Sequence, residues 1–152
     1  MTRVDVRPIK QRELEELLPL IAGYQRFYGA EPDLDRNRAF FSRFIHPSEV
    51  GLLLGAWVAE GLAGFATLYW FFSSTKAADS VLMNDLFVRD DVRGAGVGRA
   101  LIQSATEEAH RRGAAHLEWY TSPDNLKAQR LYASLPGAQR TTWYAYEIAT
   151  ED

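Results

Sequence analysis

Three glycines alternate in the segment VRGAGVGRAL (92–101), at Gly94, Gly96 and Gly98, and an arginine lies on each side of them. An apolar strand-like run precedes this segment, and a helix-like run follows it. The first turn of a helix carries unpaired N–H groups and a partial positive charge. Glycines let these donors approach a phosphate directly, and arginines add positive charge. The pattern therefore favours an anion site over a glycine-rich corner with no ligand.

Two widespread phosphate-binding loops do not fit this segment. A dinucleotide-binding turn follows G-x-G-x-x-G, but Arg99 occupies the position of the third glycine. A Walker A loop needs lysine after its last glycine, and here Gly98 is followed by the same arginine. The physical argument for an anion at the helix entrance holds without either motif.

The spacing Arg93-x-x-Gly96-x-Gly98 resembles the Q/R-x-x-G-x-G/A motif of the GNAT (general N-acetyltransferase) superfamily. Its neighbours extend the resemblance: NDLFVRDDVRGAGVGRAL (84–101) is similar to the family's strand, loop and helix, and LEWYTSPDNLKAQRLYASLPGA (117–138) is similar to its next strand and helix. The chain therefore resembles members of this superfamily, in a branch that is similar to acetyltransferases of polyamines and thialysine.

The resemblance implies acetyl-CoA as co-substrate and direct transfer of the acetyl group to an amine in a ternary complex. Main-chain groups of the strand would pair with the pantetheine arm, the glycine loop would hold the pyrophosphate, and the later helix would line the coenzyme's other side. The coenzyme-binding residues expected on this basis are Leu86, Phe87, Val88, Arg93, Gly94, Ala95, Gly96, Val97, Gly98, Arg99, Asn125 and Ala128.

Two residues are expected to be catalytic. Tyr132 completes the pattern N-x-x-A-x-x-x-Y and matches the family tyrosine that protonates the leaving thiolate, a role that suits a phenol of ordinary pKa about 10. Asp85 matches the second residue of a Glu-Asp pair that some relatives carry before the strand segment, and it could take the amine's proton. Asn84 departs from the first residue, and asparagine cannot act as a base. A water chain is the alternative to Asp85.

The acceptor is expected to lie beside aromatic residues. The segment YQRFYGAEPDLD (24–35) combines aromatic rings with carboxylates, and such groups could enclose a cation. The segment LYWFFSS (68–74) is rich in aromatic residues and is expected near the same site. They could equally be packing residues beside a solvated acidic turn. Trp70 and Tyr69 should point to opposite faces, so at most one of them lines a pocket. The substrate-binding residues expected here are Tyr24, Tyr28, Trp70 and Asn84.

Three functions stay open at this point. The first is acetyl transfer to a primary amine of a small molecule such as a polyamine, an amino acid or an amine drug. The second is acetylation of protein lysines or N-termini. The third is an acetyl-CoA-binding sensor with weak catalysis, which the departure at Asn84 keeps open.

Hydrophobic periodicity and turn residues predict an α+β domain with a mixed, mostly antiparallel sheet flanked by helices, in the order β-α-α-β-β-β-α-β-α-β. One N-acetyltransferase domain over 1–152 is expected. The strands are expected at 2–7, 51–60, 62–72, 81–88, 114–121 and 141–148, and the helices at 10–22, 33–44, 98–112 and 124–135. Asp33 should cap the second helix, and Pro19 should kink or shorten the first.

Composition narrows the class of protein. A net charge of −3 argues against a nucleic-acid partner, and no apolar run reaches 18 residues, so no membrane partner is expected. The chain has no cysteine, and its three histidines lack metal-ligand spacing, so no metal is expected. The N-terminus does not read as a secretory signal, so a cytoplasmic location is expected. The last strand, 141–148, should lie at a sheet edge that a second copy completes, which predicts a homodimer.

Overall fold

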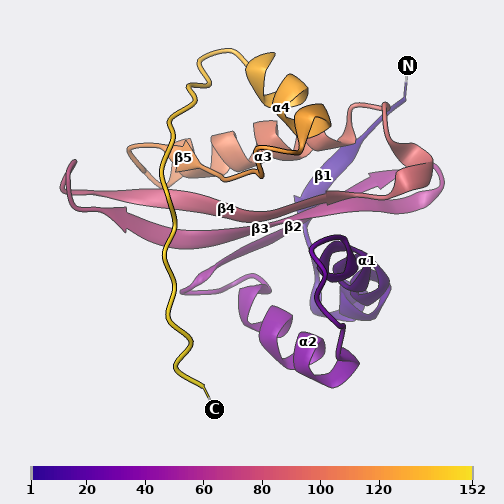
Figure 1. The fold of residues 1–152 in the computed structure, drawn as a ribbon. Helices are drawn as coiled ribbons and strands as arrows, with labels where there is room; N and C mark the ends of the chain where they lie inside the picture. Colours follow the sequence, from indigo (N-terminus) through magenta and orange to yellow (C-terminus); the bar gives the residue numbers. More distant parts are fainter. Residues whose placement is uncertain (1, 152) are drawn as a thin grey trace. The chain divides into compact units, whose positions relative to one another are not determined.

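A computed structural model describes residues 2–151, and its internal contacts divide the chain into two compact units, Met1–Tyr120 and Thr121–Asp152 (Figure 1). The first unit contains a five-stranded sheet in the order β1-β2-β3-β4-β5. Neighbours from β1 to β4 pair antiparallel, whereas β5 runs parallel to β4. The mixed, mostly antiparallel α+β fold expected from the sequence is confirmed.

Both faces of the sheet are covered, which explains why the central strands are continuous apolar runs rather than alternating ones. Helices α1 and α2 lie on one face and α3 lies on the other (Figure 1). The strands are β1 (Asp5–Pro8), β2 (Gly51–Val58), β3 (Gly61–Ser73), β4 (Ala78–Val88) and β5 (Leu117–Glu118). The helices are α1 (Leu14–Phe27), α2 (Leu34–Phe41), α3 (Val97–Arg111) and, in the second unit, α4 (Leu126–Ala133).

Helix α1 is longer than the sequence predicted, because Pro19 does not shorten it. Leu17 and Ile21 are fully buried against the sheet, and their packing stabilises the helix on both sides of the proline. Pro19 itself lies on the exposed face, where water can reach the carbonyl group that it leaves without a donor. The expected cap of α2 is confirmed: the Asp33 side chain accepts a hydrogen bond from the N–H of Arg36.

The predicted strand at 141–148 is wrong for the described structure. Residues 138–151 form neither helix nor strand, and the side chains of Trp143, Tyr144, Tyr146 and Ile148 are 83–94% exposed. Alternating aromatic residues define two faces of a strand, but a strand also needs a neighbour that accepts its main-chain hydrogen bonds. No described residue pairs with this segment in a ladder. The strand expected at 114–121 is present only as the two residues of β5.

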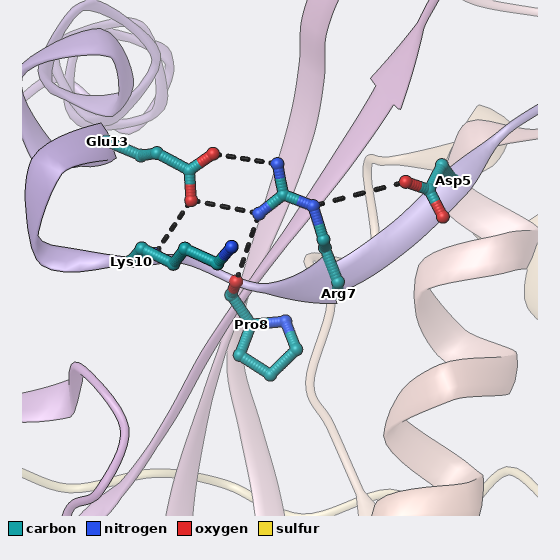
Figure 2. Close-up of polar contacts among 5 residues, drawn as sticks. All are labelled: Asp5, Arg7, Pro8, Lys10 and Glu13. Atoms are coloured by element: carbon teal, nitrogen blue, oxygen red, sulfur yellow. Dashed lines mark hydrogen bonds and ion pairs between the residues drawn. The ribbon is translucent and has the colours of Figure 1, made fainter.

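An ion pair joins β1 to the start of α1 (Figure 2). The Arg7 guanidinium donates two hydrogen bonds to the Glu13 carboxylate, over 2.9 and 2.7 Å, and lies 3.7 Å above the ring centre of Trp57. The main-chain N–H of Lys10 donates to the same carboxylate over 2.9 Å. Hydrogen bonding from Arg7 is the main cause that lowers the Glu13 pKa from 4.5 to about 2.

Replacing Glu13 with glutamine is expected to lower the free energy of unfolding by about 1–2 kcal/mol at pH 7. A lowered pKa means that this contribution is complete above about pH 4.5 and is lost as the pH falls through about 2. The variant and the natural chain should therefore converge in stability at acid pH. Urea titrations between pH 7 and pH 2 measure this, with the exposed Glu107→Gln as control. A constant difference over this range would contradict the role of the ion pair.

Candidate functional site

A β-bulge marks the middle of β4. Thr67 of β3 pairs with Asp85, but the next residue, Leu68, pairs with Met83, so Asn84 is an extra residue in its strand. Such an insertion bends a strand and re-aims its side chains. Asn84 is accordingly exposed, whereas Asp85 turns into the sheet face covered by α1.

Beyond the bulge, β4 no longer pairs with its parallel neighbour β5. The ladder with β5 includes only Val81 and Leu82, whereas Leu86 and Phe87 continue to pair with β3 on the other edge. Within the first unit, the edge of β4 after the bulge therefore has no described strand beside it. An unpaired edge offers N–H and C=O groups to an extended ligand, as the sequence analysis expected for Leu86, Phe87 and Val88.

The glycine loop connects this strand to α3. Gly94 and Gly96 have φ angles of +85° and +83°, a left-handed conformation that favours glycine. A Cβ atom at either position would meet no atom within 4 Å, so backbone conformation rather than crowding calls for glycine here. Gly96 is the N-cap of α3 and provides no side chain to its first N–H groups. These donors suit an anionic group such as a diphosphate.

The other loop residues differ in what they can contribute. Val97 is buried against the sheet, so only its main chain is open to a ligand, and Ala95 lies partly exposed in the loop. Arg93 pairs with Asp90 over 2.8 Å and approaches the Val88 carbonyl over 3.4 Å. Its charge is therefore already partly balanced. Arg99 lies exposed, two residues into α3 after Val97 and beside Gly98.

The side chain of Asp85 is enclosed, with 2% of the residue exposed. The Asn84 amide donates to its carboxylate over 2.8 Å, and the hydroxyl group of Tyr24, from α1, also lies within hydrogen-bonding reach. Thr67 Oγ1 is buried and faces the same carboxylate without closing a regular hydrogen bond. The phenol of Tyr69 lies close enough for the charge of Asp85 to raise its pKa. Three separate elements thus place polar groups around one carboxylate.

The electrostatics of this cluster favour a proton acceptor. Burial raises the pKa of Asp85, and hydrogen-bonding groups on Thr67, Asn84 and Tyr24 oppose that rise. All three groups are uncharged, so among residues 2–151 the buried carboxylate has no counter-ion of the kind that such a group normally requires. Burial also raises the pKa of Tyr69, to about 12, so this phenol stays protonated at neutral pH. Shifted carboxylates of this kind concentrate at functional sites.

The structure brings only some of the expected acceptor residues close to Asp85. Tyr24 lies at Asp85, and the ring of Tyr28, 57% exposed, lies 5.0 Å from that of Tyr24. Trp70 is not brought to this cluster: it lies under the Arg112 guanidinium, 3.6 Å away, and donates its indole N–H to Ser48.

Tyr69, which precedes Trp70 in the sequence, lies near Asp85 instead. Its ring stacks on that of Phe44, with the ring centres 5.2 Å apart. Sequence reasoning weighed Tyr69 against Trp70 and chose Trp70, and it did not consider Thr67. Thr67 and Tyr69 lie close together on β3. Their two-residue spacing puts them on one face of a strand, but only the pairing with β4 brings that face to Asp85.

In the second unit, α4 carries the other expected residues on one face. The Asn125 side chain accepts a hydrogen bond from the Ala128 N–H over 3.1 Å, so it caps the helix. Tyr132 follows Ala128 by four residues, which places both on the same side of α4. The predicted register of these three residues is therefore present in the structure.

Among residues 2–151, no group of three or more histidine, cysteine, aspartate or glutamate side chains could hold a metal ion. None of the helices in that part of the chain is long and apolar enough to cross a bilayer.

Curated relatives match most of the chain. An uncharacterised N-acetyltransferase, YhfO of Bacillus subtilis, is 32% identical over 129 residues, which are 85% of this chain and 86% of that protein. The D-amino-acid N-acetyltransferase HPA3 of Saccharomyces cerevisiae is 30% identical over 135 residues, covering 88% and 84% of the two chains. The thialysine N-epsilon-acetyltransferase of Bos taurus is 31% identical over 88 residues, 55% of this chain and 51% of that one. The predicted resemblance to the thialysine branch is thereby confirmed.

A solved structure and a family model that match this chain also belong to acetyltransferases. The crystal structure of a probable acetyltransferase superposes with a TM-score of 0.81 at 27% identity, covering 99% of both chains. The model of the acetyltransferase (GNAT) family matches residues 14–135, which include the bulge, the glycine loop and α4. The chain therefore belongs to the acetyltransferase (GNAT) family of N-acetyltransferases, enzymes that use acetyl-CoA as co-substrate.

Proposed function

We propose that this enzyme transfers the acetyl group of acetyl-CoA directly to a primary amine of a small molecule. The observation that carries the proposal is the buried Asp85 carboxylate, which has no counter-ion in the described part of the chain and lies on the strand that leads into the glycine loop. A protonated amine supplies the missing positive charge and the proton that Asp85 can accept. The names of HPA3 and the thialysine enzyme support an amino acid or a similar small amine as acceptor.

The coenzyme-binding residues proposed are those that the sequence predicted. The main chain of Leu86, Phe87 and Val88 pairs with the pantetheine arm, and the loop from Arg93 to Arg99 holds the pyrophosphate. Asn125 and Ala128 line the other side. The unpaired edge of β4 and the uncapped N–H groups of α3 support this assignment. Acetyl-CoA supplies the acetyl group as a thioester.

In the proposed reaction, Asp85 accepts one proton from the bound ammonium group, which leaves a neutral amine free to attack. Tyr132 donates one proton to the departing thiolate. Tyr28 and Asn84 border the acceptor, Asn84 by holding the Asp85 carboxylate. Binding both reactants together provides the proximity that direct transfer needs. We further propose that residues 1–152 act as one catalytic domain.

A thiol-release assay with acetyl-CoA tests the function, over a panel of amino acids, polyamines, amine drugs and basic peptides. Acetylation of a free amino acid or other small amine is expected. Preference for the peptides would instead favour a protein acceptor. Tight coenzyme binding with no acetylated acceptor would favour the sensor hypothesis.

Replacing Tyr132 with phenylalanine is expected to lower kcat by about 100-fold, because one proton donor to the thiolate is lost. The dissociation constant of acetyl-CoA should change much less, since the ring is retained. Stopped-flow turnover and calorimetric binding measure the two effects. Tyr144→Phe is the matched control, because that tyrosine lies in the same unit and is 86% exposed. An unchanged kcat would remove Tyr132 from the catalytic residues.

The predicted homodimer and cytoplasmic location stay predictions. The exposed aromatic side chains of 141–148 support association with a second copy, since large apolar surfaces of this kind normally lie in interfaces. Measurement of the molar mass in solution decides the first, and cell fractionation decides the second.

A further inference from the structure

The hydroxyl group of Tyr24 lies between two acceptors. It is 3.5 Å from the main-chain carbonyl oxygen of Asn84, and the Asp85 carboxylate lies near enough for the hydroxyl group to lower the pKa of that carboxylate. Its ring is fixed by Phe65 and Tyr28, with ring centres 6.0 and 5.0 Å away. The ring is therefore held in place while the hydroxyl hydrogen can rotate.

A phenol carries one hydrogen and can donate to only one of these acceptors at a time. When Asp85 is ionised, its negative charge is the stronger acceptor and attracts the Tyr24 hydrogen. When Asp85 is protonated, its own O–H needs an acceptor, and the Tyr24 oxygen is in place to serve. The Asn84 carbonyl can then receive the Tyr24 hydrogen. The bulge at Asn84 makes this second acceptor available.

The other groups around Asp85 differ from Tyr24 in this respect. The Asn84 amide donates to Oδ1 of Asp85 over 2.8 Å, and Thr67 Oγ1 makes no regular hydrogen bond with any described residue. Tyr69 is the other titratable group that faces the carboxylate, and no cation is among the groups that shift the pKa of Asp85. Burial, followed by the charge of Asp85, strongly raises the pKa of Tyr24, so Tyr24 stays neutral and is not itself the base.

We propose that Tyr24 is a positioning residue for proton uptake, whose hydroxyl hydrogen turns from Asp85 to the Asn84 carbonyl as Asp85 becomes protonated. The proposal rests on the proposed function, because it assigns the proton to Asp85. The number of protons is conserved in this step, because the acceptor ammonium loses one proton and Asp85 gains it. Tyr24 exchanges one hydrogen-bond partner for another without changing charge. The sequence analysis expected Tyr24 to contact the substrate, and this proposal assigns its hydroxyl group a role at Asp85.

The test compares Tyr24→Phe with the natural chain and with Tyr120→Phe, a tyrosine of the same unit that is 69% exposed and has no role in the proposed site. Tyr24→Phe keeps the ring that packs on Phe65 and removes only the hydroxyl group. Because that group lowers the pKa of Asp85, its removal should move the acid limb of the pH profile of kcat/KM to higher pH. At a fixed pH on the limb, kcat/KM should fall about fivefold, the effect of one lost hydrogen bond. Tyr120→Phe should leave the limb in place.

A titration without turnover separates this proposal from the proposed function. The carboxyl ¹³C resonance of Asp85, assigned by its loss in Asp85→Asn, reports the pKa of that group directly. This pKa should rise in Tyr24→Phe and stay unchanged in Tyr120→Phe.

An active enzyme whose limb and resonance do not move in Tyr24→Phe would overturn the role of Tyr24 alone. A moved resonance with an unmoved limb would also overturn it, because proton uptake by Asp85 would not limit the rate. A natural chain that acetylates no amine would overturn the proposed function, and this proposal with it.

Discussion

Replacing Asp85 with asparagine is expected to lower kcat/KM by about 10²- to 10⁴-fold, the range for loss of a general base. Asparagine has nearly the same shape but cannot accept the proton of an ammonium group. The neighbouring Asn84 amide can flip and present its oxygen to the new amide. The cluster with Tyr24 and Tyr69 should therefore survive the change.

The same substitution should not destabilise the fold. Burial raises the pKa of Asp85, so the folded state binds a proton more tightly than the unfolded state does. The contribution of this group to stability is then complete below the ordinary carboxyl pKa and is lost as the pH rises through the raised value. At neutral pH, the neutral asparagine avoids that cost. The midpoint temperature of unfolding should equal or exceed that of the natural chain.

Steady-state kinetics across pH and thermal unfolding at pH 7 measure both effects of this substitution. Asp79→Asn is the matched control, because Asp79 lies on the same strand but is exposed. Full activity of Asp85→Asn would show that a water chain takes the proton. Lost activity together with lost stability would indicate that Asp85 is chiefly structural.

Replacing Gly96 with valine is expected to weaken acetyl-CoA binding by at least about 100-fold. A β-branched side chain disfavours the left-handed conformation at φ +83°, and it would project beside the first N–H groups of α3. Losing two charge-assisted hydrogen bonds of about 1.5–3 kcal/mol each accounts for an effect of this size. The space beside Gly96 is open in the protein itself, so the side chain would obstruct the ligand rather than the fold.

A valine at position 96 could weaken coenzyme binding either by straining the backbone or by blocking the ligand. A glycine at the other end of the same helix provides the control that separates these two effects. Gly113 follows α3, has a φ angle of +72°, and also has open space beside it. Both Gly96→Val and Gly113→Val should lose about 1–2 kcal/mol of stability from the left-handed conformation. Only Gly96→Val should lose coenzyme affinity, measured by calorimetry on folded protein. Tight binding by Gly96→Val would remove the loop from the coenzyme site.

Local signals determined what the sequence alone could establish about this protein. The glycine loop, the Asp33 cap and the register of Asn125, Ala128 and Tyr132 depend on neighbours a few residues away. Such features depend on helix geometry and on the backbone preference of single residues, and both can be inferred from residues a few positions apart. The family resemblance rests on the same segments, so the fold class and the enzyme class could be predicted from the order of the residues.

Tertiary structure decided which side chains surround Asp85. The bulge at Asn84 sets the direction of Asp85, and it arises from a pairing between two strands that no single-strand pattern contains. The choice of Tyr69 over Trp70 depended on which face of β3 meets α1 and α2. The segment 141–148 shows the same limit, since its alternating residues predicted a strand for which no described residue supplies a ladder partner. Alternation is a property of one segment, whereas pairing, burial and proton affinity depend on what the fold brings beside it.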